Sequence, residues 1–294
     1  MTTKSYLQSH TSSLVGKTVA ITGSTGGLGR VWVEYLASLG ASLILLDRNQ
    51  ARSEALRDAL IKTHGIPVRC IGVDLEDMHA VQEATAALRS LPIDIFIHNA
   101  GAYKIPRKAC QNGLNNVFQI NFASPYYMIR ELLPTLRARG GHVVAVGSIA
   151  HNYSRIDEKD VDFSTRRAPS KVYGNAKRHL MFSLLELFKS EHAVSLSIVH
   201  PGITLTNMTS HFPKPLFAVM KYPMKIIFMS PRRACLSLLY GVFEFCSHDE
   251  WIGPRIFHVW GLPKKQKLRT ASPQERAKIS LRAEQIYKNW KGTE

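Results

Sequence analysis

Cysteine is scarce in this sequence, and its few copies are scattered. The four cysteines are Cys70, Cys110, Cys235 and Cys246. They form no CxxC pair and no cluster of the kind that holds zinc, so neither a disulfide framework nor a structural metal site is expected. The sequence therefore predicts free thiols in a reducing compartment, which makes the protein cytoplasmic by expectation.

Long hydrophobic runs are also missing. No stretch reaches the roughly 18 consecutive apolar residues that a membrane-spanning helix requires. The first residues, MTTKSYLQSHTSSLVGK, contain no apolar core of the length found in signal peptides. We expect a protein that does not cross a membrane, and contact with a membrane surface stays open as an alternative.

Acidic residues are outnumbered by basic ones. The chain has 38 Lys and Arg against 22 Asp and Glu, a formal net charge of +16, and from Trp251 onward ten Lys or Arg stand against three Glu. Such a surface can bind nucleic acid or an anionic membrane, but a solvated face that maintains solubility is the simpler interpretation. Because there is no zinc finger, zipper or aromatic-basic RNA motif, nucleic acid is not expected as a partner.

Short apolar runs alternate with helical stretches along the first two thirds of the chain. Their apolar character is nearly continuous, which is typical of strands that helices cover on both faces. Strand–helix alternation with short connections predicts an α/β fold, a Rossmann-type doubly wound parallel sheet with right-handed crossovers. Since no linker or repeat interrupts the pattern, residues 1–294 are expected to form a single domain. Strands are expected over 17–23, 41–47, 68–74, 93–99, 142–148 and 194–200.

Two extensions flank this pattern. Residues 1–16 precede the first expected strand, and residues 262–294 form a basic C-terminal segment. In the latter, Ser272 is followed by Pro273 and then by Glu275, the signature of a capping box with proline at the first helical position. The sequence therefore predicts a C-terminal helical extension.

Glycines cluster between the first expected strand and its helix, in TGSTGGLGR. Gly23, Gly27 and Gly29 allow a tight turn and a close approach of the backbone to a pyrophosphate. The free N–H groups and the positive dipole end of the following helix would face the same anion. In this α/β context the motif predicts a dinucleotide site, with Thr25 and Leu28 of the same turn as further contacts.

The end of the second expected strand bears on the choice of dinucleotide. A carboxylate at Asp47 would accept the ribose hydroxyls of NAD(H) and repel a 2′-phosphate, whereas Arg48 would pair with the 2′-phosphate of NADP(H). No Lys or Arg lies within the glycine turn itself. NAD(H) is therefore favoured as cofactor, and NADP(H) is kept as the alternative.

The third expected strand ends in Asp74 and Leu75, which would lie beside the adenine. Asp74 is placed to accept a hydrogen bond from the adenine amino group. The sequence supports an equally good second interpretation, in which Asp74 is simply the N-cap of the next helix.

Two tyrosines have a lysine four residues further along, one turn of helix away. Tyr173 and Lys177 form one pair, and Tyr287 and Lys291 form the other. Spacing cannot separate them, because either pair would stack on one face of a helix. Tyr287 and Lys291 close the amphipathic C-terminal helix, with no strand end or glycine loop nearby, so that pair is expected to be structural.

The motifs from about residue 17 to about residue 261 resemble the short-chain dehydrogenase/reductase family. In order, the matching segments are TGSTGGLG, VDL, HNAG, FQINF, VGSIAH, YGNAK and HPGITLT. Within the family the chain is most similar to the retinol-dehydrogenase-like branch, through NGLNNVFQINFASPYYMIRELLP, GSIAH and the late segments GPR and WGLPKK. Ser124, Gly147 and Ala176 depart from residues common in that branch, and none of these changes removes a group that the chemistry requires.

The resemblance implies an NAD(P)-dependent oxidoreductase acting on CH–OH groups, with a catalytic tetrad. Tyr173 would donate a proton to a carbonyl or accept one from an alcohol. Lys177 would lower the pKa of that phenol and hold the nicotinamide ribose. Ser148 would hydrogen-bond the substrate oxygen, and Asn121 would hold a water that connects Lys177 to solvent.

The resemblance also implies further cofactor contacts and a substrate lid. Residues 203–233 would cover the substrate, and their methionines and aromatic residues suit a hydrophobic alcohol or carbonyl compound that is retinoid-, steroid- or lipid-like. The same residues could instead pack a helix onto the core, and the lysines among them would suit a lid resting on an anionic bilayer. The further cofactor contacts are Asn99, Ala100 and Gly101 of HNAG, and Pro201, Thr204 and Thr206 near the nicotinamide. Asn99 is expected mainly to stabilise the sheet.

Two other classes of protein remain as alternatives to the enzyme. Assembly into a homo-oligomer is a separate expectation that stays open. One alternative is a non-catalytic protein that senses NAD(P) on the same fold, and another is a basic surface binder of membrane or nucleic acid. Retention of both Tyr173 and Lys177 argues for the enzyme. His151 and His200 lie beside the expected site, but no second ligand recurs at a suitable spacing, so no metal is expected.

Overall fold

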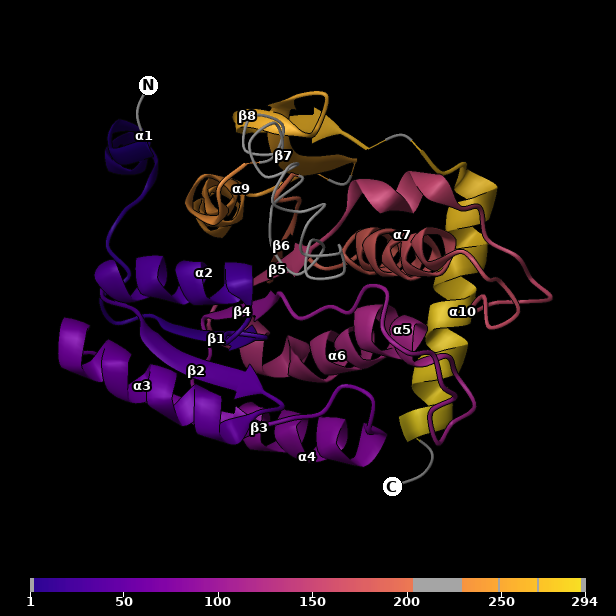
Figure 1. Ribbon diagram of the computed structural model, residues 1–294, viewed down its shortest axis with the longest axis horizontal. Helices are drawn as coiled ribbons and strands as arrows, with labels where there is room; N and C mark the ends of the chain where they lie inside the picture. Colours follow the sequence, from indigo (N-terminus) through magenta and orange to yellow (C-terminus); the bar gives the residue numbers. More distant parts are fainter. Residues whose placement is uncertain (1–2, 203–228, 248, 269, 292–294) are drawn as a thin grey trace, which may run out of the picture.

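One eight-stranded sheet forms the centre of the protein, with helices packed on both of its faces (Figure 1). The computed structural model describes residues 3–202, 229–247, 249–268 and 270–291. The strand order is β3-β2-β1-β4-β5-β6-β7-β8, and the order reverses direction between β1 and β4. This is the doubly wound arrangement that the sequence predicts, and the crevice of such a sheet lies where the order reverses.

The six expected strands are all present and all parallel. β1, β2, β4, β5 and β6 are almost entirely buried, because helices cover both faces, whereas β3 at the sheet edge is half-exposed. The strands are β1 Thr18–Thr22, β2 Ser42–Asp47, β3 Val68–Gly72, β4 Ile95–His98, β5 His142–Val146 and β6 Ser195–Val199.

Two further strands extend the sheet and were not expected. β7, Glu250–Ile256, runs parallel to β6, and β8, Trp260–Lys267, returns antiparallel to β7. The prediction that residues 262–294 form a purely helical extension is therefore wrong, because the first residues of this segment belong to β8. Glycine, proline and lysine in EWIGPRI and WGLPKKQK hide the strand pattern. Lysines on an edge strand also discourage pairing with another chain.

The helices divide between the two faces of the sheet. The helices α2, α3 and α9 share one apolar cluster with the sheet, and α4, α6 and α7 share the other (Figure 1). The bounds of these six are α2 Gly27–Ser38, α3 Gln50–His64, α4 Met78–Arg89, α6 Ser124–Arg137, α7 Pro169–Leu187 and α9 Pro231–Phe243. The others are α1 Thr3–His10, α5 Asn116–Phe118, the π-helix η1 Gln119–Ala123, the 3₁₀ helix η2 Ile149–Tyr153 and α10 Pro273–Lys291.

The expected capping box is formed at the start of α10. The N–H of Glu275 donates to Ser272 Oγ at 3.2 Å, and the helix begins at Pro273. The Glu275 carboxylate turns inward instead of back to Ser272, and it accepts hydrogen bonds from Arg178 Nε and Nη2 at 2.7 and 2.6 Å. This pair joins α10 to α7, and Figure 1 shows α10 beside the end of α7 at the right of the molecule.

Two further expectations can be compared with the described residues. The four cysteines are free thiols. Among the helices that the structure describes, none is both long and apolar enough to cross a membrane.

Candidate active site

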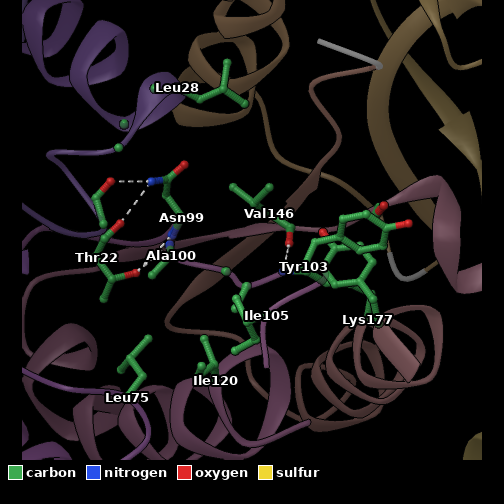
Figure 2. A pocket seen from close by; sticks show the side chains of 18 of the residues that line it. Thr22, Leu28, Leu75, Asn99, Ala100, Tyr103, Ile105, Ile120, Val146 and Lys177 are labelled. Atoms are coloured by element: carbon green, nitrogen blue, oxygen red, sulfur yellow. Dashed lines mark hydrogen bonds between the residues drawn. The ribbon is translucent and has the colours of Figure 1, made fainter. Parts of the chain in front are cut away.

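A cavity of about 940 Å³ lies at the carboxyl ends of the parallel strands, around the point where the strand order reverses. The glycine turn after β1 forms one part of its wall, and α7 and the end of β6 form another. Figure 2 shows the first part near Thr22 and Leu28, and α7 at Lys177. The residues expected in the site that line this cavity are Gly23, Thr25, Gly27, Leu28, Gly29, Asp47, Arg48, Asp74, Leu75, Asn99, Ala100, Gly101, Ser148, Tyr173, Lys177 and Pro201.

The turn after β1 accepts only glycine at two positions. Gly23 has φ +69°, and a Cβ atom there would lie 2.9 Å from the Cα of Ala100. At Gly29 a Cβ atom would lie 2.0 Å from the carbonyl oxygen of Gly23. The first residue of α2 is Gly27, so the free N–H groups of that helix begin at the cavity wall. This arrangement suits an anion such as a pyrophosphate.

Asp47 fastens the glycine turn to the second strand. It is 5% exposed, and it accepts hydrogen bonds from the N–H and Oγ1 of Thr25 at 3.1 and 2.9 Å. The hydroxyl groups of Ser24 and Ser53 also donate to its carboxylate. This structural role was not apparent from the sequence, and it leaves Asp47 in the cavity wall, with Arg48 exposed beside it.

The structure does not use Asp74 as a helix cap. The N-cap of α4 is Asp77, whose side chain accepts from the N–H of His79 at 2.9 Å. Asp74 Oδ1 accepts from the N–H of Glu76 at 3.0 Å and lines the cavity. The plain-cap interpretation of Asp74 is therefore wrong, and Asp74 is available to a bound molecule.

Asn99 joins β4 to the first strand, as expected. Its side-chain amide donates to the carbonyl oxygens of Thr22 and Gly23 at 3.1 and 2.9 Å, and its backbone N–H donates to Thr22 Oγ1 at 3.1 Å. Figure 2 shows the side chain between these partners. The hydrogen bonds hold the glycine turn beside Ala100.

Ser148, Tyr173 and Lys177 converge on one end of the cavity. Proline at the first position of α7 starts the helix that carries Tyr173 and Lys177 on one face. The side chain of Ser148 lies close enough to the phenol of Tyr173 to lower its pKa. Lys177 is 1% exposed, and its Nζ donates to the carbonyl oxygen of Val146 at 2.9 Å (Figure 2).

The electrostatics of this pair differ from the expectation. Burial raises the pKa of Tyr173 to about 12, although the nearby Ser148 side chain opposes that change. Burial lowers the pKa of Lys177 to about 7. The expected lowering of the phenol pKa by Lys177 is therefore not found. The ammonium group lies 5.8 Å from the centroid of the Tyr173 ring, and its hydrogen bond is made to Val146.

Asn121 lies behind the cavity wall, inside the π-helix η1. Its Nδ2 donates to the carbonyl oxygens of Val117 and Ala102, both at 2.8 Å. A Cβ atom on Gly101 would lie 2.9 Å from Asn121 Oδ1 and 3.7 Å from Lys177 Nζ, so the two side chains approach the same glycine. Single π-turns of this kind occur frequently at functional sites.

Tyr103 is a site residue that sequence reasoning missed. Its ring meets that of Tyr173 edge to face, with centroids 5.3 Å apart and planes at 76°, and it lines the cavity (Figure 2). Lys104, the next residue, has φ +55°. Its position in the sequence could have indicated it, because Tyr103 comes two residues after HNAG, which follows a strand.

The two histidines near the site make different contacts within the protein, His151 a hydrogen bond and His200 a ring contact. His151 Nδ1 lies 2.6 Å from the carbonyl oxygen of Ser148, and His200 stacks on Trp251 with ring centroids 5.2 Å apart. Burial lowers the pKa of His151 to about 4 and that of His200 to about 3. In the part of the chain that the structure describes, no group of three or more His, Cys, Asp or Glu could hold a metal ion.

Part of the expected site lies outside the described residues. Thr204 and Thr206 fall in this part, as does most of the expected lid over 203–233. At the end of that range, Met229 is 2% exposed, and Pro231 already begins α9.

Known proteins resemble this chain in sequence and in fold. The dehydrogenase/reductase SDR family member FEY of Arabidopsis thaliana is 28% identical, over 92% of this chain and 76% of its own length. Retinol dehydrogenase 14 of Mus musculus is 30% identical, over 69% of this chain and 66% of its own length. The crystal structure of an uncharacterised protein from Mycobacterium paratuberculosis superposes with a TM-score of 0.76 at 24% identity, covering 94% of this chain and 95% of that one, which establishes likeness of fold.

The family model described as short chain dehydrogenase matches residues 17–215, from the first strand past the end of the sixth. That range contains the glycine turn, the four residues expected to form the tetrad and all six parallel strands that were expected. The chain therefore belongs to the short-chain dehydrogenase/reductase family, whose members are oxidoreductases that use a nicotinamide cofactor on alcohol and carbonyl groups.

Proposed function

We propose that this protein interconverts a hydrophobic alcohol and its carbonyl compound, with NAD(H) as the favoured cofactor. The observation that carries the proposal is the convergence of Ser148, Tyr173 and Lys177 at one end of a cavity whose other end is the glycine turn. The glycine turn fits a pyrophosphate, because the close approach of Gly29 to the carbonyl oxygen of Gly23 holds the N-terminus of α2 at the cavity wall. When bound, the nicotinamide supplies or accepts a hydride.

The side chains of this protein would handle the proton. Ser148 and Tyr173 lie close together in the cavity wall, so a substrate oxygen bridging the two hydroxyl groups would be fixed in position. Tyr173 would then donate its proton during reduction and accept one during oxidation. Lys177, charged or neutral according to pH near 7, would stabilise the phenolate once it forms. Asn121, close to Lys177 across Gly101, would hold the water that returns the proton from solvent.

The preference for NAD(H) is supported by Asp47. Four hydrogen-bond donors fix its carboxylate in the wall of the cavity, where it would repel a 2′-phosphate. NADP(H) is the second candidate, because Arg48 and Arg52 also line this end and are both exposed. These guanidinium groups would pair with a 2′-phosphate if they turned inward.

The hydrophobic substrate is supported by the wall beside Tyr173. Tyr103, Ile105, Ile149 and Tyr153 all line this part of the cavity. Aromatic and branched side chains around a few hydroxyl groups suit a ligand that is mainly apolar, such as a retinoid, a steroid or another lipid. The relative named retinol dehydrogenase 14 favours the same class. The lid over 203–233, assembly into a homo-oligomer and a cytoplasmic location remain predictions.

Thermal unfolding with NADH and with NADPH, each at the same excess, tests the cofactor assignment. A ligand that binds only the folded state stabilises it by about 2.7 kcal/mol at a hundredfold excess over its Kd. A larger stabilisation by NADH is expected from Asp47, and a larger one by NADPH would favour the arginines. If the double variant Arg48→Ala and Arg52→Ala loses the stabilisation by NADPH and keeps the stabilisation by NADH, these two arginines bind the 2′-phosphate of NADPH.

A panel of retinol, steroid alcohols and short alcohols then separates the enzyme from its alternatives. Turnover of the apolar alcohols above the short ones is expected. Cofactor binding without turnover of any alcohol or carbonyl compound would favour the NAD(P)-sensing protein. Absence of any cofactor effect, together with heparin affinity lost at modest salt, would favour the basic surface binder.

A further inference from the structure

The hairpin between β7 and β8 ends in a strained turn. The N–H of Val259 donates to the carbonyl oxygen of Ile256 at 2.9 Å, and the two residues between them, Phe257 and His258, have φ +48° and +58°. Positive φ at both central positions is the feature of a type I′ turn, which favours Asn and Gly. A phenylalanine in this conformation is an outlier that the fold itself does not require.

The strained residue is also the most exposed large apolar side chain of the described residues. Phe257 is 87% exposed, and Ile256 and Trp260 beside it are 44% and 36% exposed. The protein therefore gains little apolar burial from Phe257. We call Ile256, Phe257 and Trp260 the hairpin tip.

Two arginines lie at the hairpin tip. The guanidinium group of Arg233 lies 4.5 Å from the centroid of the Trp260 ring, and Arg255, the residue before Ile256, is exposed. The sequence from 253 to 263 contains no Asp or Glu. Aromatic and apolar side chains bordered by arginine are typical of segments that enter the headgroup region of a bilayer, where the rings meet the acyl boundary and the cations meet phosphate.

The turn that carries the hairpin tip packs against a residue of the cavity wall. β7 is parallel to β6, so its carboxyl end lies at the same edge of the sheet as the site. Gly202, which lines the cavity, packs against the turn, because a Cβ atom on it would lie 2.7 Å from the carbonyl oxygen of Val259. A surface that receives the hairpin tip would therefore lie on the side of the protein where Gly202 lines the cavity.

We propose that the hairpin tip docks on an anionic lipid bilayer. Phe257 and Ile256 enter the headgroup region, Trp260 lies at its boundary, and Arg255 pairs with lipid phosphates. The charge of the whole chain, +16, favours the same surface. A protein partner fits less well, because the tip is a single small turn with strong basic flanks instead of a broad face. Docking can be measured without turnover, so this proposal does not rest on the proposed reaction.

Co-sedimentation of the full chain with vesicles tests it, using phosphatidylcholine alone and phosphatidylcholine with phosphatidylserine. The informative variant is Phe257→Asn, since asparagine tolerates positive φ and the turn should persist. Phe245→Asn is the matched control. Phe245 is 55% exposed, but it packs on His142 at the start of β5, the opposite edge of the sheet.

The parent protein is expected to bind the vesicles that contain phosphatidylserine, and Phe257→Asn to weaken that binding about tenfold or more. Arg255→Glu should weaken it in those vesicles by a similar factor and leave the weak binding to phosphatidylcholine unchanged. Phe245→Asn should bind like the parent.

Three results would overturn the proposal. The first is no binding of the parent at low salt, and the second is equal binding of Phe257→Asn and the parent. The third is a change of oligomeric state in Phe257→Asn, seen by light scattering, with vesicle binding intact, which would make a second copy of the chain the occupant of the tip.

Discussion

The buried guanidinium of Arg178 and the carboxylate of Glu275 are joined by two hydrogen bonds, of 2.7 and 2.6 Å. Arg178 is the residue after Lys177 on α7, and Glu275 stands in the first turn of α10. The C-terminal helix thus supports the helix that carries Tyr173 and Lys177. The side chain of Arg178 is 0% exposed, so its charge depends on this partner and on nearby carbonyl oxygens.

Glu275→Ala is therefore expected to destabilise the fold strongly, by about 3 kcal/mol, because it leaves the buried charge of Arg178 without its carboxylate. A fall in Tm of about 5 °C or more should result. Glu158→Ala is the control, since Glu158 pairs with Lys278 of the same helix on the exposed surface. Equal Tm values for the two variants would contradict this account of the Arg178 pair.

Lys177 should make the stability of the protein depend on pH. Its pKa is about 7 in the folded protein and near the ordinary 10.5 in the unfolded chain. Between these values the unfolded chain binds a proton that the folded chain does not, so the free energy of unfolding rises with pH. From pH 7 to 9, Tm is expected to rise more in the parent than in Lys177→Met. Parallel Tm profiles would show that burial does not lower the pKa of Lys177.

Gly29→Ala should damage both the turn and the cofactor site. The new Cβ atom would lie 2.0 Å from the carbonyl oxygen of Gly23, so the backbone must move. A lower Tm and at least about tenfold weaker binding of NADH are expected. Gly26→Ala is the steric control, because its Cβ atom would lie 3.5 Å from the same oxygen. If both variants keep the Tm of the parent, the predicted clash between a Cβ atom at position 29 and the carbonyl oxygen of Gly23 does not exist.

The central sheet and the outline of the site were predictable because both depend on local patterns. Continuous apolar runs marked β1 to β6, and the glycine turn needed only its place after the first strand. β7 and β8 were missed because proline, glycine and lysine within them have no strand pattern until the chain pairs with β6.

The finer features of the site depend on contacts between distant residues. Asp47 is bound by Ser24 and Thr25, 23 and 22 residues away, and Tyr103 meets Tyr173 only in the fold. The pKa of Lys177 follows from burial, which spacing alone does not reveal. The pair of Tyr287 and Lys291 was predicted to be structural, and both side chains contact Glu131 of α6 instead of the cavity.

Comparison of Tyr173 with Tyr287 gives the most direct test of the catalytic assignment. Oxidation of an apolar alcohol that the parent turns over should be followed through NADH absorbance in the parent, Tyr173→Phe and Tyr287→Phe. Loss of the proton acceptor in Tyr173→Phe is expected to lower kcat about a thousandfold, with the thermal shift caused by NADH unchanged. Tyr287→Phe should turn over at the parent rate, although it loses the hydrogen bond to Glu131. A Tyr173→Phe variant with the kcat of the parent would contradict the assignment.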